Sequence, residues 1–207
     1  YLAMAGATRR TLAQLAPFAR WQTPGAVLQE HKGPDTVWAD PACFSRADVQ
    51  LFDPAFWPHN TGSIGTGSGR GTIHRVGDER AHYLLRHYYR GGLMARLSRD
   101  LFLAQRLADT RAMAEFTLLR RLHARGLPVP QAAAARCRRH GAFYRADILG
   151  QWIPDARDVA QLLHQQRALS TREWQSLGRV VRQLHDEQVF HSDLNCHNLM
   201  FDAWGKA

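Results

Sequence analysis

The chain has 207 residues, of which 45% are hydrophobic and 22% are charged, a composition typical of a globular protein that buries a core. No apolar run approaches the roughly 20 residues that span a bilayer, and the first residues lack the apolar core of a secretory signal, so we expect a cytoplasmic protein. The net charge of +9 favours a partner that carries phosphate groups, such as a nucleotide, an anionic lipid or a nucleic acid.

Residues 1–60 contain many prolines and glycines and show little periodicity. We expect a short helix over Thr11–Arg20, followed by an irregular segment whose large side chains pack onto a neighbouring sheet. These side chains are Phe44, Leu51, Phe52, Phe56 and Trp57. Residues 1–40 are assigned to an N-terminal extension.

From residue 61 the sequence becomes regular. The glycine-rich stretch TGSIGTGSGRGT leads into a predicted strand over Thr72–Val76, a GDER turn and a second predicted strand over His82–Tyr88. Apolar residues at helical spacing then predict a helix over Leu107–Arg125, and Gly126 and Pro128 end it.

Two strands are predicted over Ala132–Cys137 and Phe143–Leu149, with an RRHG turn between them. Residues 152–154 read as a linker, and Asp155–Gln165 as a short helix. The capping-box pattern Ser170–Glu173 predicts the start of another helix that ends near residues 185–188.

One face of that helix is predicted to carry Trp174, Leu177, Val181 and Leu184. A polar loop, HSDLNCHN, follows, and then a short strand over Leu199–Phe201. This order favours an α+β protein with two lobes. The β-rich N-lobe, with one main helix, takes residues 41–150, and the start of a helical C-lobe, with the polar loop, takes residues 151–207.

The glycine-rich stretch could bind phosphate, because glycines let backbone N–H groups approach it closely. The expected contacts come from Gly67, Gly69 and Gly71. A strand rather than a helix follows, and no GKS or GKT is present, which argues against Rossmann and Walker loops. A loop between strands covers phosphates in kinase-like folds, although a flexible linker fits equally well.

A kinase-like lobe needs a cation on the second strand, held by a carboxylate on the following helix. The only lysines are Lys32 and Lys206, so the candidate is Arg86, whose planar fork can bond phosphate and carboxylate. Its candidate partner is Glu115. A surface arginine and a solvated helix glutamate remain the alternatives.

The polar loop has the spacing His-x-Asp-x4-Asn at His191, Asp193 and Asn198, which is the spacing of the kinase catalytic loop. Asp193 could accept or orient the proton of an acceptor hydroxyl, and the Asn198 amide oxygen could bind Mg²⁺. His191 could brace the loop through hydrogen bonds. A purely structural polar loop remains open.

A zinc site is a weaker alternative. It would use His185, His191, Cys196 and His197, but successive separations of six, five and one match no common structural zinc site. With Cys43 and Cys137 far away in the chain, reduced thiols are expected.

The sequence resembles the Kdo kinases of Gram-negative bacteria, within the lipopolysaccharide core kinases. The resemblance spans roughly residues 40–202. It is carried by GSGRGT at 67–72, LRHYYRGGL at 85–93, AEFTLLRRLHARGLPVP at 114–130, YRADIL at 144–149, GRVVRQLHD at 178–186 and HSDLNCHN at 191–198.

The resemblance implies a protein-kinase-like fold and a phosphotransferase that acts on an alcohol with ATP and Mg²⁺. The implied acceptor is the 4-hydroxyl of 3-deoxy-D-manno-octulosonic acid (Kdo) on a lipid A precursor, at the cytoplasmic face of the inner membrane. Asp193 is the implied catalytic base and Asn198 a magnesium ligand; Asn195 and His197 belong to the same loop without assigned roles. Arg90, Arg96 and Arg99 are expected to meet the anionic glycolipid or the membrane surface.

One part of the family pattern is missing. An Asp-Phe-Asp stretch follows the catalytic loop in the family, and its first aspartate binds Mg²⁺; Asp202 comes only four residues after Asn198, too early for that role. We therefore expect a chain truncated at the C-terminus, which as given could be inactive.

Two other functions remain open from the sequence. One is a small-molecule kinase of the aminoglycoside or choline type, which shares the loop spacing. The other is a non-catalytic kinase-like module or a basic nucleic-acid binder, although no recognisable nucleic-acid motif accompanies the charge.

Overall fold

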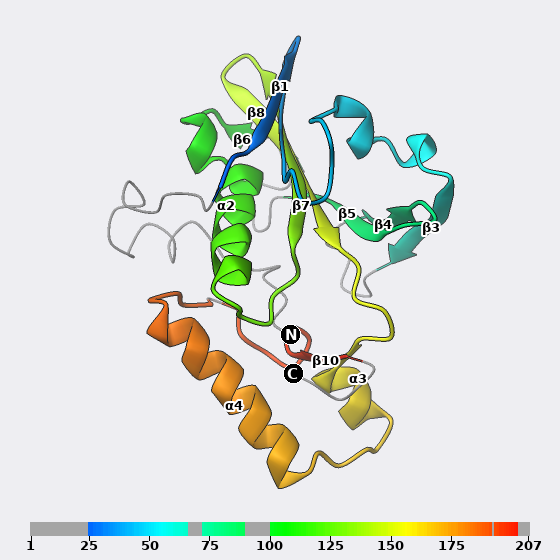
Figure 1. Cartoon of the computed structure of the whole chain (residues 1–207), viewed down its shortest axis with the longest axis vertical. Helices are drawn as coiled ribbons and strands as arrows, with labels where there is room; N and C mark the ends of the chain where they lie inside the picture. The colour runs from blue at the N-terminus through cyan, green and yellow to red at the C-terminus, as the bar shows by residue number, and fades with distance from the viewer. Residues whose placement is uncertain (1–24, 66–71, 90–99, 192, 203–207) are drawn as a thin grey trace. The chain divides into compact units, whose positions relative to one another are not determined.

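A computed structural model describes residues 25–65, 72–89, 100–191 and 193–202 (Figure 1). The chain divides into two compact units. The β-rich unit takes Gly25–Leu118 and Gln131–Trp152, and the helical unit takes Tyr1–Pro24, Leu119–Pro130 and Ile153–Ala207. The helix predicted over Thr11–Arg20 lies outside the described residues.

The β-rich unit is built on an antiparallel sheet with the strand order β1-β2-β7-β8-β5-β4-β3, and β6 also pairs with β8. The strands are β1 (Leu28–Lys32), β2 (Asp35–Ala39), β3 (His59–Gly65), β4 (Thr72–Gly77), β5 (His82–His87), β6 (Phe102–Leu103), β7 (Ala132–His140) and β8 (Phe143–Gln151).

Four of these strands, β4, β5, β7 and β8, confirm the sequence prediction. β7 and β8 run further than predicted, because the turn uses Gly141, at φ +56°, and not the whole RRHG stretch. The sequence pattern does not predict β1 and β2. They form a hairpin around Gly33, whose φ of +59° is a conformation that glycine adopts without a side-chain clash.

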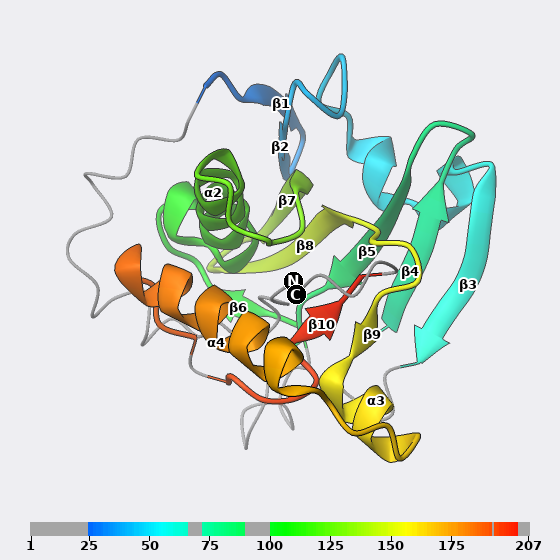
Figure 2. The same ribbon diagram turned by 60° about the horizontal axis from the view of Figure 1, so that its bottom comes forward.

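Helix α2 (Arg111–Ala124) packs against one face of this sheet (Figure 2). Phe116 is fully buried, and its ring lies 6.4 Å from that of Trp38 on β2. The helix begins four residues later than predicted. Leu107–Asp109 forms a 3-10 turn instead, which is closed when the Thr110 hydroxyl donates to the Leu107 carbonyl.

The opposite face of the sheet carries a second core. Two 3-10 helices, η2 (Val49–Phe52) and η3 (Pro54–Phe56), bring in Leu51, Phe52 and Trp57, which are buried against it. These residues confirm the predicted packing of the aromatic segment, and Phe44 packs beside them. Phe56 is the exception, because it stays 45% exposed, although its ring meets the Trp57 ring edge-on.

The helical unit contains α3 (Val159–His164), α4 (Thr171–Asp186) and a two-stranded ribbon of β9 (Arg157–Asp158) and β10 (Met200–Phe201). Both helices begin with a capping box, at Asp158 and Ser170. The Ser170 box confirms the prediction. The helix predicted from Asp155 begins later, because residues 157–158 pair with β10 and Asp158 caps α3.

The predicted buried face of α4 is partly wrong. Leu177 and Leu184 are buried, but Val180 rather than Val181 completes the stripe, and Trp174 is 50% exposed. A spacing of three, then four, residues places Val180 between the two leucines on one side of the helix.

Among the described residues, no helix is both long enough and apolar enough to cross a bilayer.

Candidate functional site

The first group of candidate residues lies in the β-rich unit, around Arg86. Strand β5 is flanked by β4 and β8, and Arg86 pairs in register with Ile73 on one side and Ile148 on the other. Its Nη2 donates to Oε1 of Glu115 on α2 over 2.5 Å. The structure therefore brings together the strand cation and the helix carboxylate that the sequence singled out.

A third residue, Tyr88, completes this group, and the sequence analysis missed it. Its hydroxyl donates to Oε2 of Glu115 over 2.5 Å and accepts from Arg86 Nη2 over 3.2 Å. The Arg86 guanidinium carbon also lies 4.9 Å from the centre of the Tyr88 ring. The sequence held one signal for this contact. Tyr88 follows Arg86 by two residues, and alternate residues of a strand share a face.

The charges in this group stabilise one another. Burial alone would lower the pKa of Arg86, but the attraction of Glu115 and the bonds to Glu115 and Tyr88 outweigh it and raise that pKa. Burial raises the pKa of the Tyr88 hydroxyl well above its ordinary value, and the negative charge of Glu115 adds to the shift. Arg86 is thus a permanent cation and Tyr88 a permanent hydrogen-bond donor.

The glycines expected above this group are not placed. Gly67, Gly69 and Gly71 lie outside the described residues. Their flanking strands are described: β3 and β4 are antiparallel neighbours, and Gly65 pairs with Thr72. The segment between them therefore joins two paired strands, as the sequence analysis expected.

The second group lies in the helical unit, in the loop between α4 and β10. His191 is 3% exposed, and its Nδ1 accepts from the Asp193 backbone N–H over 3.3 Å. Asn198 is also buried, and its side-chain Nδ2 donates to the Asp193 carbonyl over 2.6 Å. These two bonds hold the backbone of Asp193 from both sides, while its side chain is exposed.

Asn195 contacts the same aspartate. Its Nδ2 donates to Asp193 Oδ1 over 3.1 Å and to the Asp193 carbonyl over 3.2 Å, and its Oδ1 accepts from the His197 N–H over 2.9 Å. The loop is also tied to the first turn of α3, because the Ala160 N–H donates to the Cys196 carbonyl over 3.2 Å.

These contacts bear on how a magnesium ion could be held. With Nδ2 of Asn198 committed to a carbonyl, its Oδ1 is the atom of the amide that could ligate a cation, and oxygen is the donor that Mg²⁺ prefers. One buried amide oxygen fits a magnesium ligand but is not a complete donor set. No group of three or more His, Cys, Asp or Glu side chains that could hold a metal is found among the described residues.

The zinc alternative gains no support from the same search. His185 stacks on the Phe190 ring, with 6.2 Å between centroids, and Cys196 is exposed. His197 contacts Asp158, with 3.4 Å between Nδ1 and Oδ2.

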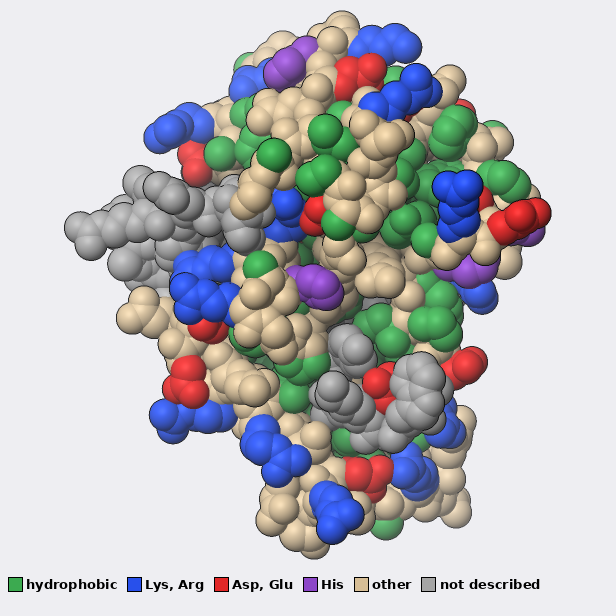
Figure 3. All heavy atoms as spheres, in the orientation of Figure 1, with side chains coloured by type: hydrophobic (Ala, Val, Ile, Leu, Met, Phe, Trp, Pro, Cys, Tyr) green, Lys and Arg blue, Asp and Glu red, His purple; other side chains and the backbone are tan. Residues whose placement is uncertain are grey.

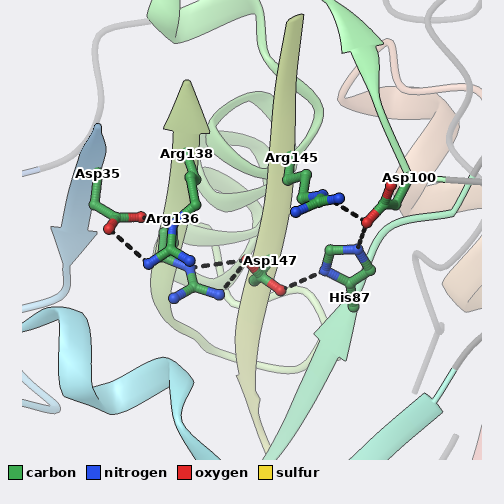
Figure 4. Close-up of polar contacts among 7 residues, drawn as sticks. All are labelled: Asp35, His87, Asp100, Arg136, Arg138, Arg145 and Asp147. Carbon is green, nitrogen blue, oxygen red and sulfur yellow. Dashed lines mark hydrogen bonds and ion pairs between the residues drawn. The ribbon is translucent and has the colours of Figure 1, made fainter. Parts of the chain in front are cut away.

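A partly buried network of charges on the β-rich unit was also missed from the sequence (Figure 4). Asp147 on β8 is 5% exposed, and its Oδ2 accepts from Arg136 Nε on β7 over 2.9 Å. Its Oδ1 lies 2.7 Å from Nδ1 of His87 on β5. Asp100 then contacts both His87, over 3.4 Å, and Arg145, over 2.6 Å.

A neighbouring pair extends this row of charges to β2. Arg138 donates to both oxygens of Asp35 over 2.8 Å each. The residues come from strands far apart in the sequence, so only the pairing of the strands reveals the row. The one signal in the sequence was that charged residues stand two apart on each strand, Arg136 and Arg138 on β7 and Arg145 and Asp147 on β8.

The sequence of this chain is similar to those of known proteins. Residues 54–207 match the lipopolysaccharide kinase (Kdo/WaaP) family. Three similar curated proteins are each named 3-deoxy-D-manno-octulosonic acid kinase. They come from Photobacterium profundum, 41% identical over 81% of this chain and 70% of the relative, from Vibrio cholerae, 39% over 80% and 70%, and from Haemophilus influenzae, 42% over 73% and 65%.

The chain thus spans about two thirds of the length of these relatives. The family match and the mixed architecture, a β-rich unit with one main helix followed by helices, confirm the predicted protein-kinase-like fold.

Proposed function

Since the chain belongs to the lipopolysaccharide kinase (Kdo/WaaP) family, we propose that the protein transfers a phosphoryl group from ATP to a Kdo sugar in lipopolysaccharide core biosynthesis. The finer proposal is that the acceptor is the 4-hydroxyl of Kdo on a lipid A precursor. The names of the relatives, each a Kdo kinase, support the sugar.

The observation that carries the chemistry is the way the loop holds Asp193. His191, Asn195 and Asn198 all bond to this residue, and its carboxylate still faces solvent. A fixed, exposed carboxylate can accept or orient the proton of an incoming hydroxyl. The hydroxyl oxygen then bonds to the γ-phosphorus of ATP, the bond from that phosphorus to the β-bridging oxygen breaks, and ADP leaves.

The remaining candidates have supporting roles in this proposal. Arg86, fixed by Glu115 and Tyr88, holds the phosphates of the nucleotide, and Gly67, Gly69 and Gly71 cover them. Mg²⁺, when bound, neutralises negative charge on the phosphates, and Asn198 is one residue that would hold it. His191 braces the loop.

We also propose that the enzyme works at the cytoplasmic face of the inner membrane without spanning it. The support is the net charge of +9 and the anionic, membrane-bound character of the proposed acceptor. Arg90, Arg96 and Arg99, the proposed docking residues, lie outside the described part of the chain.

The test of the chemistry is Asp193→Asn in the full-length protein, with phosphate transfer from ATP to a Kdo-lipid A precursor as the assay. We expect a loss of at least about 10²-fold in kcat, because general bases contribute this much or more, while acceptor binding stays unchanged. Asp186→Asn is the control, since Asp186 is an exposed aspartate that pairs with Arg182 on α4.

Turnover near the wild-type rate in Asp193→Asn would remove Asp193 from its role. Phosphorus NMR of the product identifies the phosphorylated hydroxyl. Transfer to a soluble aminoglycoside or to choline, with none to the Kdo lipid, would overturn the proposed acceptor.

A further inference from the structure

Tyr88 lies where its side chain can set the orientation of the Arg86 guanidinium. It directly follows β5, and its backbone N–H donates to the Ala146 carbonyl of β8 over 3.0 Å, so the strand pairing continues through it. Residues two apart in a strand share a face. Tyr88 and Arg86 therefore both point toward Glu115 on α2, as their bonds to it show.

The carboxylate of Glu115 is shared between these two side chains. Glu115 is 8% exposed, Oε1 accepts from Arg86, and Oε2 accepts from the Tyr88 hydroxyl. A buried carboxylate oxygen without a donor is costly. The tyrosine hydroxyl therefore donates a hydrogen bond to Oε2, the carboxylate oxygen of Glu115 that does not bond to Arg86.

The same hydroxyl also fixes the rotation of the guanidinium. Nη2 carries two hydrogens, and its two acceptors are Glu115 Oε1 and Tyr88 Oη. The donors that remain for a phosphate are on Nη1 and Nε, because a guanidinium has five N–H donors in all. The Tyr88 ring, 4.9 Å from the guanidinium carbon, supports the plane from one side.

We propose that Tyr88 is a positioning residue of the kinase: its hydroxyl holds Glu115 and Arg86 in the orientation that presents Nη1 of Arg86 to the nucleotide phosphates. This inference rests on the proposed function, in which Arg86 binds those phosphates. The guanidinium is planar and directs its donors along fixed directions, so a second anchor besides the helix carboxylate is needed to set which of them faces the phosphates. The high pKa of the buried hydroxyl supports the role, since Tyr88 remains a donor at physiological pH.

Tyr88→Phe in the full-length protein tests the inference, because it removes the hydroxyl and keeps the ring. We expect KM for ATP to rise about tenfold, the effect of losing one hydrogen bond to a charged group, with a smaller change in kcat. Tyr144→Phe is the matched control. Tyr144 is a buried tyrosine of the same unit, and its hydroxyl accepts from the Arg111 N–H over 3.2 Å, away from Arg86. It should lower the melting temperature and leave KM for ATP within about twofold of wild type.

A double-mutant comparison separates positioning from general damage. If Tyr88 acts through Glu115, Tyr88→Phe should add little to the KM of Glu115→Gln. A wild-type KM in Tyr88→Phe, a rise equal to that in Tyr144→Phe, or fully multiplicative effects of the Tyr88 and Glu115 changes would each overturn the inference while leaving Arg86 in its role. Wild-type ATP affinity in Arg86→Met would instead contradict the role of Arg86 in the proposed function, and the inference with it.

Discussion

Arg86 and His87 are successive residues of β5, so their side chains point to opposite faces of the sheet. Arg86 bonds to Glu115 on α2. The His87 side chain instead faces the partly buried charge network that Figure 4 shows. The charged groups around its ring are Asp147, Asp100, Arg136 and Arg145. Burial alone would lower the pKa of His87, but the bond to Asp147 and the attraction of Asp147 and Asp100 outweigh it, and the pKa is raised above 6.5.

A stability that depends on pH follows from this shift. A raised pKa in the folded state means that folding favours the protonated ring, so the contribution of His87 is complete below pH 6.5. It is lost as the pH rises through the higher pKa of the folded protein. We therefore expect the melting temperature to fall between pH 6 and pH 8.

His87→Gln should flatten this pH dependence and lower the melting temperature at pH 6. The control is His140→Gln, because His140 is an exposed histidine at the end of β7. An unchanged pH profile in His87→Gln, measured by thermal unfolding in matched buffers, would contradict the assignment of the effect to this ring.

At the scale of the elements, α4 leads into the His-x-Asp-x4-Asn loop and depends on its N-terminal cap. The Ser170 hydroxyl accepts from the Glu173 N–H over 3.3 Å, and the Glu173 carboxylate accepts from the Ser170 N–H over 2.8 Å. Such a box satisfies N–H groups that have no partner within the helix.

Ser170→Ala should cost about 1 kcal/mol of stability, or a melting temperature lower by about 2–4 °C for a chain of this size. Ser176→Ala makes the same chemical change inside the same helix and should shift the melting temperature far less. Equal shifts in the two variants, measured by calorimetry, would show that the cap at Ser170 does not stabilise α4.

Elements with a clear pattern were predictable from the sequence. The apolar and β-branched runs of β4, β5 and β8, the turn residues that flank the strands, and the box at Ser170 place these elements to within a few residues. The second box, at Asp158, has the less common pattern Asp-x-x-Gln. β1 and β2 were missed because each has only five residues and β1, at the edge of the sheet, is polar at four of its five positions, so hydrophobicity does not mark the hairpin.

The candidate site was predictable where its residues follow a spacing along the chain. The order along the chain of a strand arginine, a helix glutamate and a His-x-Asp-x4-Asn loop can be recognised from a single sequence. Tyr88 and Asp147 were not predictable, because their partners lie 27 and 60 residues away. The first contact depends on how α2 packs on the sheet and the second on the pairing of β5 with β8. A tyrosine at a strand end is as typical of packing as of a hydrogen bond to a carboxylate.

At the scale of the whole molecule, the basic side chains of the described residues are often paired with acidic ones. In Figure 3 the Lys and Arg side chains stand at many separate places on the face in view, several of them beside Asp or Glu. Many described arginines are paired, among them Arg121 and Arg125 with Glu187, and Arg138 with Asp35. Paired charges attract a membrane weakly, so membrane docking needs a cluster that is not neutralised in this way.

Arg90, Arg96 and Arg99 are the proposed docking residues, and the ten residues from 90 to 99 contain no Asp or Glu. Each arginine near an anionic bilayer contributes about 1 kcal/mol, so replacing all three by Ser should weaken binding to vesicles with anionic lipid by about 10²-fold. Binding should also fall steeply between 0.1 M and 1 M salt, where the screening length drops from about 10 Å to about 3 Å. Vesicle co-sedimentation measures both effects.

The matched control carries the same loss of charge elsewhere. Arg172, Arg179 and Arg182 are exposed on α4, and their replacement by Ser should reduce vesicle binding only slightly if the docking surface is local. Activity gives a second measure: the 90–99 variant should lose more activity on membrane-embedded acceptor than on a short-chain soluble one. Equal losses on the two acceptors, or equal loss of vesicle binding in the two triple variants, would contradict docking through this cluster and leave only a general effect of net charge.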